Sequence, residues 1–181
     1  DKAAVVTIDG GGIETAEGTP VAASIWCGSG NMLENLEYIP DYVLNIGCVW
    51  TRATRYVFRY ESGWPQGHQA GTVMALAALG DPKVWLKDVA RWFAEDHRQV
   101  LETPNGHVRG MSAKDPRSPK HPYLYKYEHI AESNEQEKYN LAASLQHVTE
   151  TYIFQIVQRA LELCPGVEYL CVSGGVALNS V

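Results

Sequence analysis

The chain has 181 residues, of which 45% are hydrophobic and 20% are charged. This length predicts one substantial globular core, and no apolar run approaches the roughly 20 residues that a membrane-spanning helix needs. The formal net charge of -6 argues against a broad nucleic-acid surface. We therefore expect neither a nucleic acid nor a membrane as a partner.

The cysteine pattern bears on the cellular compartment. Cys27, Cys48, Cys164 and Cys171 show no C-x-x-C pairing and no histidine at zinc-finger spacing. The pattern predicts thiols that are reduced and mostly buried. Reduced thiols favour a cytoplasmic protein.

The first predicted element is a strand at residues 3–8, where "AAVVTI" is a continuous apolar and β-branched run. Such a run is typical of a strand that is buried on both faces. A second strand at residues 21–26 follows a Gly-Thr-Pro turn, so the two strands are predicted to form a hairpin across "IETAEGTP". Asp9 then lies at the end of the first strand, where ligands can approach.

Helical patterns dominate the middle of the chain. Residues 45–60 have apolar positions near helical spacing, and residues 70–80 suit a short helix that ends at Gly80. A third helix is predicted within residues 82–102. Residues 103–133 lose the periodicity and contain four prolines, as in a long connection that is either functional or mobile.

The most regular helical pattern covers residues 139–164. Its apolar positions recur at steps of three or four, at Leu141, Leu145, Val148, Tyr152, Ile156, Ala160 and Leu163. A Pro-Gly turn follows, then a strand at residues 167–172, a glycine turn and the start of a further helix. This order of elements indicates an α/β fold.

Two glycine-rich turns, "DGGG" at residues 9–12 and "SGGVALNS" at residues 173–180, are candidate phosphate sites, because glycines after a strand let backbone amides approach an anion. Each turn alone is more often an ordinary tight turn, since neither carries a full G-x-G-x-x-G or Walker pattern. Asp9 caps its own turn equally well. Together, however, two such strand ends can face one site, where Asp9 would hold a metal that bridges phosphate oxygens.

Polar and aromatic residues of the connection leave two interpretations open. The basic group either contacts a phosphate or an anionic acceptor, or forms a solvated loop, which is commoner; its members are Lys114, Arg117, Lys120, His121 and Lys126. Tyr123, Tyr125 and Tyr127 alternate at strand spacing and either stack on a sugar ring or pack a sheet edge. The six histidines form no H-x-x-x-H pair, so most are expected in surface or structural positions.

Five segments occur in a recognisable order: "AAVVTIDGGGIET", "NIGCVWTRAT", "AGTVMALAALG", "NLAASLQHVTETYIFQIVQRALE" and "LCVSGGVALNSV". They resemble consecutive blocks of the O-carbamoyltransferase family, which includes nodulation protein U and antibiotic-tailoring carbamoyltransferases. The resemblance covers residues 3–181, is most specific at "SGGVALNS" and has no recognised block in residues 101–137. It implies an α/β fold that is part of an actin-like ATPase (ribonuclease H-like) domain, with a mixed sheet, flanking helices and a helical insertion.

The resemblance also implies that residues 1–181 form a single partial domain, truncated at both ends. Members of the family begin earlier, with a paired-histidine metal motif, and continue into a second domain. Surface left open by the missing flanks favours self-association, so a homo-oligomer is a possible state. An incomplete site predicts weak nucleotide binding or none by these residues alone.

The implied activity is ATP-dependent transfer of a carbamoyl group from carbamoyl phosphate to a hydroxyl of a sugar, antibiotic or similar metabolite, through a carbamoyl-adenylate. In the family, histidines and aspartates hold iron or a similar divalent metal, a Lewis acid, and one of those aspartates corresponds to Asp9. The nucleotide-binding residues that the resemblance implies are Gly10, Gly11, Gly12, Gly174, Gly175 and Asn179. It assigns no catalytic residue within the chain.

Two features keep other interpretations open. The family usually has D-G-x-G-E, whereas here Ile13 follows Gly12 and the carboxylate comes one residue later, as Glu14. Asn179 is equally well a residue of the first helical turn. The alternatives are another actin-like ATPase-fold enzyme, such as a sugar kinase or a threonylcarbamoyl-transfer protein, and a non-catalytic binding module.

Overall fold

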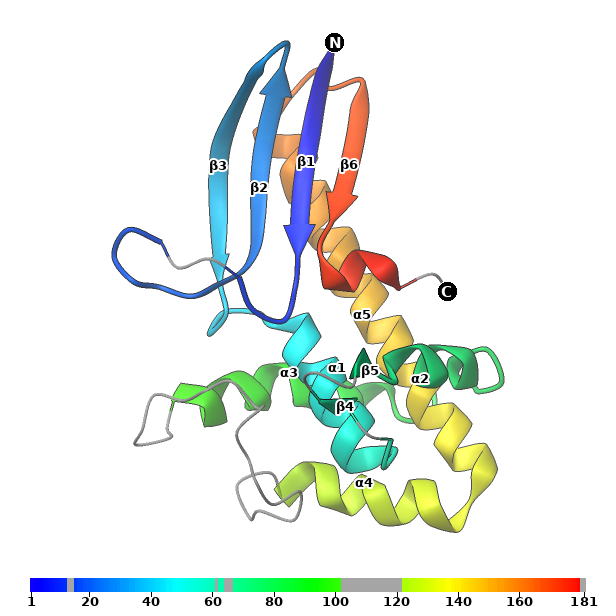
Figure 1. The fold of residues 1–181 in the computed structure, drawn as a ribbon. Helices are drawn as coiled ribbons and strands as arrows, with labels where there is room; N and C mark the ends of the chain where they lie inside the picture. The colour runs from blue at the N-terminus through cyan, green and yellow to red at the C-terminus, as the bar shows by residue number, and fades with distance from the viewer. Residues whose placement is uncertain (13–14, 61, 64–66, 102–121, 180–181) are drawn as a thin grey trace. The chain divides into compact units, whose positions relative to one another are not determined.

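The computed structural model describes residues 1–12, 15–60, 62–63, 67–101 and 122–179 (Figure 1). The described chain divides into two compact units, the first of residues 1–47 and 149–179 and the second of residues 48–148. Within the described residues, no helix combines the length and apolarity that a membrane crossing requires.

The first unit is built on a four-stranded mixed sheet (Figure 1). Its strands lie in the order β3-β2-β1-β6, and their bounds are β1 (Lys2–Ile8), β2 (Val21–Ser29), β3 (Met32–Pro40) and β6 (Tyr169–Ser173). β1 and β2 are antiparallel, which confirms the predicted hairpin, and β6 lies parallel to β1 on its other side. This mixed α/β arrangement is consistent with the expected ribonuclease H-like, actin-like fold.

β1 is fully buried on one face only, which corrects the prediction of burial on both faces. Ala4, Val6 and Ile8 are buried, whereas Val5 and Thr7 between them are half-buried. The buried residues lie on the side of the sheet that faces the second half of α5 (Glu135–Leu163), where Arg159 pairs with Glu37 of β3. The physical reason is the period of two along a strand, which turns alternate side chains to opposite faces.

Two contacts tie the second half of α5 to this sheet. The Arg159 Nε lies 2.9 Å from the Glu37 Oε2 of β3, in a half-exposed ion pair. Cys164, directly after α5, forms a disulfide with Cys27 of β2. Because Ile25 is the cross-strand partner of both Val6 and Glu37, these contacts lie on the buried face of the sheet.

The opposite face of the sheet carries polar and aromatic cross-strand pairs. The Thr7 and Ser24 hydroxyl oxygens lie 2.6 Å apart, and the indole N–H of Trp26 donates to the Ser24 Oγ at 2.7 Å. The Trp26 ring meets Tyr38 edge-on, with 6.0 Å between centroids. Pairs of this kind stabilise neighbouring strands, here β1, β2 and β3.

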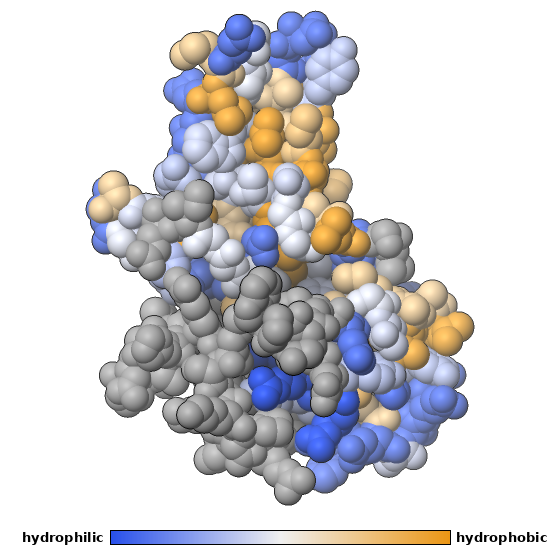
Figure 2. Space-filling model, viewed as in Figure 1, coloured by the Kyte–Doolittle hydropathy of each residue, from blue (hydrophilic) through white to orange (hydrophobic). Residues whose placement is uncertain are grey.

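β6 is exposed along its whole length. Tyr169, Leu170 and Val172 are 54%, 44% and 42% exposed, although they alternate between the two faces of the strand. Figure 2 shows apolar side chains gathered over the sheet. The first unit therefore presents apolar surface that a soluble monomer ordinarily covers.

The second unit is mainly helical. It contains the end of α1 (Ile46–Arg52), the π-helical turn η1 (Ala53–Val57), α2 (Ala70–Ala77), α3 (Leu86–Leu101), α4 (Pro122–Ser133) and the first half of α5. Two short antiparallel strands, β4 (Ser62–Gly63) and β5 (Gly67–His68), lie between η1 and α2. The helices predicted within residues 45–60, 70–80 and 82–102 are thus confirmed.

The long predicted helix is also confirmed, as α5. Of its seven predicted apolar positions, five are buried: Leu141, Leu145, Val148, Ile156 and Ala160. Polar side chains of α5 anchor the segment between α2 and α3. Asn140 accepts a hydrogen bond from the Asp81 N–H at 2.9 Å, and the Ser144 hydroxyl donates to the Pro82 carbonyl at 2.8 Å. These bonds explain why two polar residues of α5 are buried.

Gly80 ends the α2 segment for a reason that the sequence did not reveal. A Cβ at this position would lie 2.1 Å from the Tyr139 carbonyl oxygen of α5. The glycine therefore permits close packing of two backbones, in addition to stopping the helix.

The alternation of Tyr123, Tyr125 and Tyr127 was wrongly interpreted as strand spacing, because all three lie in α4. This helix also occupies the last part of the connection that was predicted at residues 103–133. Pro122 is tolerated there since it occupies the first helical turn, where the missing N–H has no helical partner. Lys126 lies 4.0 Å from Asp88 of α3 and over the Tyr127 ring, so it is engaged within this unit. The other basic residues of the connection, Lys114, Arg117, Lys120 and His121, lie outside the described residues.

β3 was not predicted. Its N-terminal signal is the turn before it, where Gly30 has a φ of 58° and is followed by Asn31. A glycine and an asparagine between two apolar runs are typical of a tight hairpin. The strand itself mixes exposed apolar and acidic residues, which hides the alternation.

The cysteine prediction was wrong for two reasons. Cys27 and Cys164 form a disulfide, with their Cα atoms 5.7 Å apart, and Cys171 is exposed on β6. The pairing brings together residues 137 positions apart, a contact that no local spacing reveals. The inference of a cytoplasmic location from reduced thiols therefore loses its basis.

The Cys27–Cys164 bond should stabilise the first unit. We expect Cys27→Ser to lower the free energy of unfolding of the oxidised protein by about 2–5 kcal/mol, because the bond closes a long loop. Dithiothreitol should cause the same loss in the native protein and none in the variant. Urea unfolding measures both, and Cys171→Ser, which removes an exposed thiol, serves as the control. Equal stability with and without reductant would contradict the bond.

Tyr127 joins α4 to α3. Its hydroxyl donates to the Asp88 Oδ1 at 2.5 Å, and its ring meets Trp85 and Trp92 at centroid distances of 5.8 and 5.1 Å. Burial raises the pKa of Tyr127 well above its ordinary range, and the hydrogen bond and charge of Asp88 raise it further. The folded protein therefore favours the neutral phenol.

This raised pKa predicts a loss of stability at alkaline pH. Below a pH of about 10 the phenol is protonated in both folded and unfolded chains, so its contribution is complete. As the pH rises further, the unfolded chain ionises first and the folded state loses stability. Tyr127→Phe should reduce this alkaline loss in urea unfolding, whereas Tyr42→Phe, at an exposed tyrosine, should leave it in place. Identical alkaline curves for the two variants would contradict the assignment.

Candidate functional site

The two glycine-rich turns lie at one edge of the sheet. β1 and β6 are parallel neighbours, with Thr7 opposite Ser173, so their carboxyl ends coincide. Asp9 directly follows β1, and Gly174 directly follows β6. In α/β sheets, ligands bind at the carboxyl ends of parallel strands. Pairing of the strands thus brings together residues that lie more than 160 positions apart.

The Asp9 carboxylate joins the two turns. Its Oδ1 accepts a hydrogen bond from the Gly10 N–H at 2.7 Å, and its Oδ2 accepts one from the Gly175 N–H at 3.1 Å. The Asp9 N–H donates to the Ala22 carbonyl of β2 at 2.8 Å. The side chain is exposed although both oxygens accept backbone bonds. Asp9, Gly10 and Gly175 therefore form one connected group.

The turn after β6 requires two glycines. Gly174 has a φ of 100°, and a Cβ there would lie 2.2 Å from the Ile8 carbonyl oxygen. A Cβ on Gly175 would lie 2.9 Å from the Asp9 Oδ1 and would displace the carboxylate. Gly175 also begins the 3-10 turn η2 (Gly175–Leu178). Larger residues at either position would separate the two turns.

The turn after β1 exposes backbone amides. Gly11 and Gly12 are exposed, and their N–H groups make no hydrogen bond to any residue that the structure describes. A Cβ on Gly12 would lie 2.7 Å from the Val21 carbonyl oxygen, so this glycine allows the loop to pass close to β2. Nothing lies within 4 Å of the Cβ direction of Gly11. The turn thus offers two N–H donors of the kind that bind anions.

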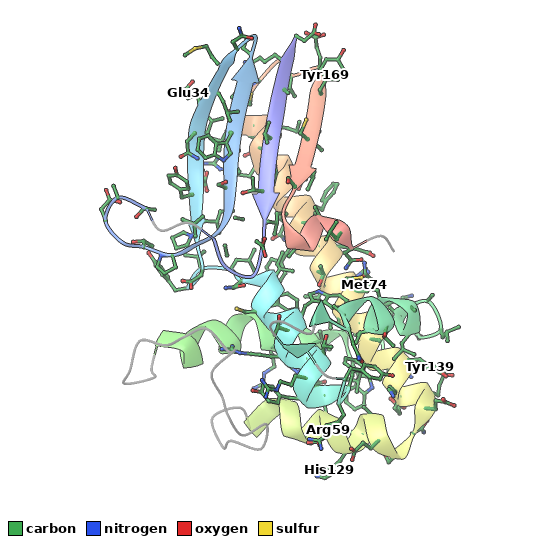
Figure 3. The ribbon with its side chains drawn as sticks, viewed as in Figure 1. Glu34, Arg59, Met74, His129, Tyr139 and Tyr169 are labelled. Carbon is green, nitrogen blue, oxygen red and sulfur yellow. A yellow bond between two sulfur atoms is a disulfide. The ribbon has the colours of Figure 1, made fainter. Side chains whose placement is uncertain are left out.

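The remaining predicted residues have different environments. Asn179 directly follows η2, is half-buried and has extended backbone angles, with a φ of -68° and a ψ of 108°. Ile13 and Glu14 lie outside the described residues. His129, labelled in Figure 3, and His147 are exposed, as expected for surface histidines.

Sequence reasoning missed Asn45, which lies directly before α1. Its side chain is buried, and its Nδ2 donates to the Gly10 carbonyl at 3.3 Å. An asparagine before a helical pattern is typical of a helix cap, so the sequence offers no signal for this contact.

The described residues do not form a protein metal cage. They contain no group of three or more His, Cys, Asp or Glu side chains that could hold an ion together. Asp9 therefore has no such set of co-ligands among them. An iron site as the family resemblance implies would need ligands from outside these residues.

Comparison with known proteins gives the same family as the sequence motifs. The family described as "Carbamoyltransferase N-terminus" matches residues 1–181, the whole chain. A curated relative, the uncharacterized protein sll1178 of Synechocystis sp. (strain ATCC 27184 / PCC 6803 / Kazusa), is 28% identical over 194 residues. The alignment covers 100% of this chain and 28% of that relative, so the chain spans little more than a quarter of the relative's length. The chain belongs to the carbamoyltransferase family and corresponds to its N-terminal part.

Proposed function

We propose that these residues form the nucleotide-phosphate part of an ATP-dependent O-carbamoyltransferase. The family match supports carbamoyl transfer in general. The observation that carries the finer proposal is the Asp9 carboxylate, which bridges the glycine turns after β1 and β6. The acceptor would be a hydroxyl of a sugar, antibiotic or similar metabolite.

The amides of the first turn supply the phosphate contacts in this proposal. Gly11 and Gly12 present N–H groups at an exposed edge, and a phosphate brings several acceptor oxygens. Backbone amides bind phosphate without the conformational cost of ordering long side chains. Asp9 contributes by fixing the two turns, because its oxygens already accept the Gly10 and Gly175 N–H groups. Asn179, after η2, would lie on the nucleotide side as a polar contact.

The negative charge of the Asp9 carboxylate repels a nearby phosphate that has no bound cation. Mg²⁺ is usually held by one or two carboxylates together with substrate phosphates, so a single aspartate suits a Mg²⁺ that arrives with ATP. A resident metal with only protein ligands requires more side chains than the described residues supply. The family's divalent metal thus remains part of the proposal only with ligands from elsewhere in the protein.

The proposed reaction has three steps. Carbamoyl phosphate first loses its phosphate to water and yields carbamate. A carbamate oxygen then attacks the α-phosphorus of ATP, the bond to the β-phosphate oxygen breaks, and pyrophosphate leaves. Finally the acceptor hydroxyl attacks the carbamoyl carbon and loses its proton, and AMP leaves with the electrons of the broken C–O bond. Glycine amides around the phosphates would hold the α-phosphorus in line for attack.

The cytoplasm is the compartment that an ATP-consuming reaction favours. The disulfide between Cys27 and Cys164 points the other way, because such bonds are rare in the cytosol of most organisms. We retain the cytoplasm as part of the proposal on the ground of the co-substrate. Labelling of thiols in freshly lysed cells distinguishes the two states of this pair.

The complete open reading frame should release pyrophosphate from ATP only when carbamoyl phosphate is present, before any acceptor is added. A coupled pyrophosphate assay with divalent metal supplied measures this release. Release of ADP together with a phosphorylated acceptor would instead indicate a kinase. No nucleotide turnover by a folded, metal-supplied protein would favour a binding module.

Asp9→Asn should lower this pyrophosphate release by roughly 10- to 100-fold, because loss of one acceptor releases a turn and misplaces the phosphates. Gly175→Ala should have a similar effect, since its Cβ would displace the carboxylate. Glu34→Gln, which removes an exposed carboxylate from β3, is the matched control and should retain full activity. Thermal unfolding verifies that each variant is folded. Wild-type activity in folded Asp9→Asn would contradict the assigned role.

A further inference from the structure

The turn after β1 makes a contact that the proposed function leaves unexplained. Asn45, which lies directly before α1, is buried, and its Nδ2 donates to the Gly10 carbonyl at 3.3 Å. The two residues are 35 positions apart in the chain. Both belong to the first compact unit. A buried amide side chain thus binds the backbone of the glycine turn after β1, which is the loop referred to below.

A second contact from the same segment is independent of this hydrogen bond. A Cβ on Gly47 would lie 2.4 Å from both the Cα and the N of Gly10, and 3.0 Å from the Asp9 carbonyl carbon. The backbone of the first turn of α1 therefore packs directly on the backbone of the loop. No residue other than glycine fits at this position without moving the loop.

These contacts determine how the Gly10–Gly11 peptide is oriented. Asp9 Oδ1 accepts the Gly10 N–H, and Asn45 binds the Gly10 carbonyl, so Gly10 is held on both sides. A peptide group is planar and trans, and its C=O and N–H point in opposite directions. Because the carbonyl points toward the Asn45 side chain, the Gly11 N–H points away from it. Gly11 is exposed, and its N–H makes no hydrogen bond to any residue that the structure describes, so this amide is available to a ligand.

We propose that Asn45 and Gly47 are positioning residues for ATP, which aim the Gly11 amide at a substrate phosphate. This inference rests on the proposed function, since it assigns the phosphate contact to the same turn. Neither residue contacts the reacting atoms. They act through the orientation of one peptide group, and ATP binding should depend on them more than folding does.

The test uses the full-length protein with substitutions at Asn45 and a matched asparagine. Asn35 of β3 also donates its Nδ2 to a backbone carbonyl at 3.3 Å, that of Ile25, but lies on a strand away from the glycine turns. Asn45→Ala should raise the Kd for ATP by roughly 3- to 10-fold, as expected for one hydrogen bond. Asn45→Asp, which places an acceptor opposite the carbonyl, should weaken binding further. Asn35→Ala should leave the Kd unchanged.

Kinetics separate positioning from a general loss of structure. In the pyrophosphate assay, Asn45→Ala should raise the KM for ATP while the KM for carbamoyl phosphate stays constant. A merely structural role would lower the fraction of active protein and leave both KM values unchanged. An unchanged KM for ATP, with a lower melting temperature in both asparagine variants, would overturn the proposal.

Gly47→Ala provides a second line of evidence. Its Cβ would displace Gly10, so ATP binding should fall by more than tenfold, whereas Gly28→Ala of β2 meets only ordinary contacts, the nearest at 3.7 Å. Gly47→Ala with wild-type ATP affinity would overturn the proposal as well.

Amide hydrogen exchange keeps this inference separate from the proposed function. In the absence of ligand, Asn45→Ala should speed exchange in the peptide that contains residues 9–12, and Asn35→Ala should not. If the wild-type protein binds no ATP while this exchange difference is present, the proposed function is wrong. The inference is then limited to the statement that Asn45 positions the turn after β1. If the exchange rates are equal, Asn45 does not position the loop and the inference fails by itself.

Discussion

The parallel pairing of β1 with β6 is the constraint on which the candidate site depends. It places the ends of two strands from opposite ends of the chain at one sheet edge, where the Asp9 carboxylate accepts the Gly175 N–H. Without this pairing, each glycine turn would be an isolated tight turn. With it, one short side chain connects the two turns. α5 directly precedes β6 in the chain, and contacts of its C-terminal half with β3, and of Cys164 directly after it with β2, hold it to the same sheet.

Glycine at the site serves close backbone approach more than flexibility. Gly174 and Gly47 each lie so near another backbone that a Cβ would meet it within 2.4 Å. Gly11, in contrast, has open space beside it, and its value lies in an exposed N–H group. The same residue type therefore has two roles within one small region, one in packing and one in presenting donors to a ligand.

Local patterns were sufficient for most of the elements. The period of α5 and the hairpin of β1 and β2 depend on neighbouring residues, and both were predicted. Burial of β1 on one face, the disulfide of Cys27 and Cys164, and the contact of Asn45 with Gly10 all depend on distant parts of the chain. The ordered motifs indicated Asp9 and the glycine turns, but the strand pairing that connects them is a tertiary feature.

A structure of the complete protein with a nonhydrolysable ATP analogue and Mg²⁺ would test directly whether the glycine turn after β1 binds the nucleotide phosphates. We expect phosphate oxygens within hydrogen-bonding distance of the Gly11 and Gly12 N–H groups, with the Asp9–Gly175 bond retained. Nucleotide phosphates bound at another edge of the sheet, or an Asp9 side chain that turns away from Gly175, would contradict it.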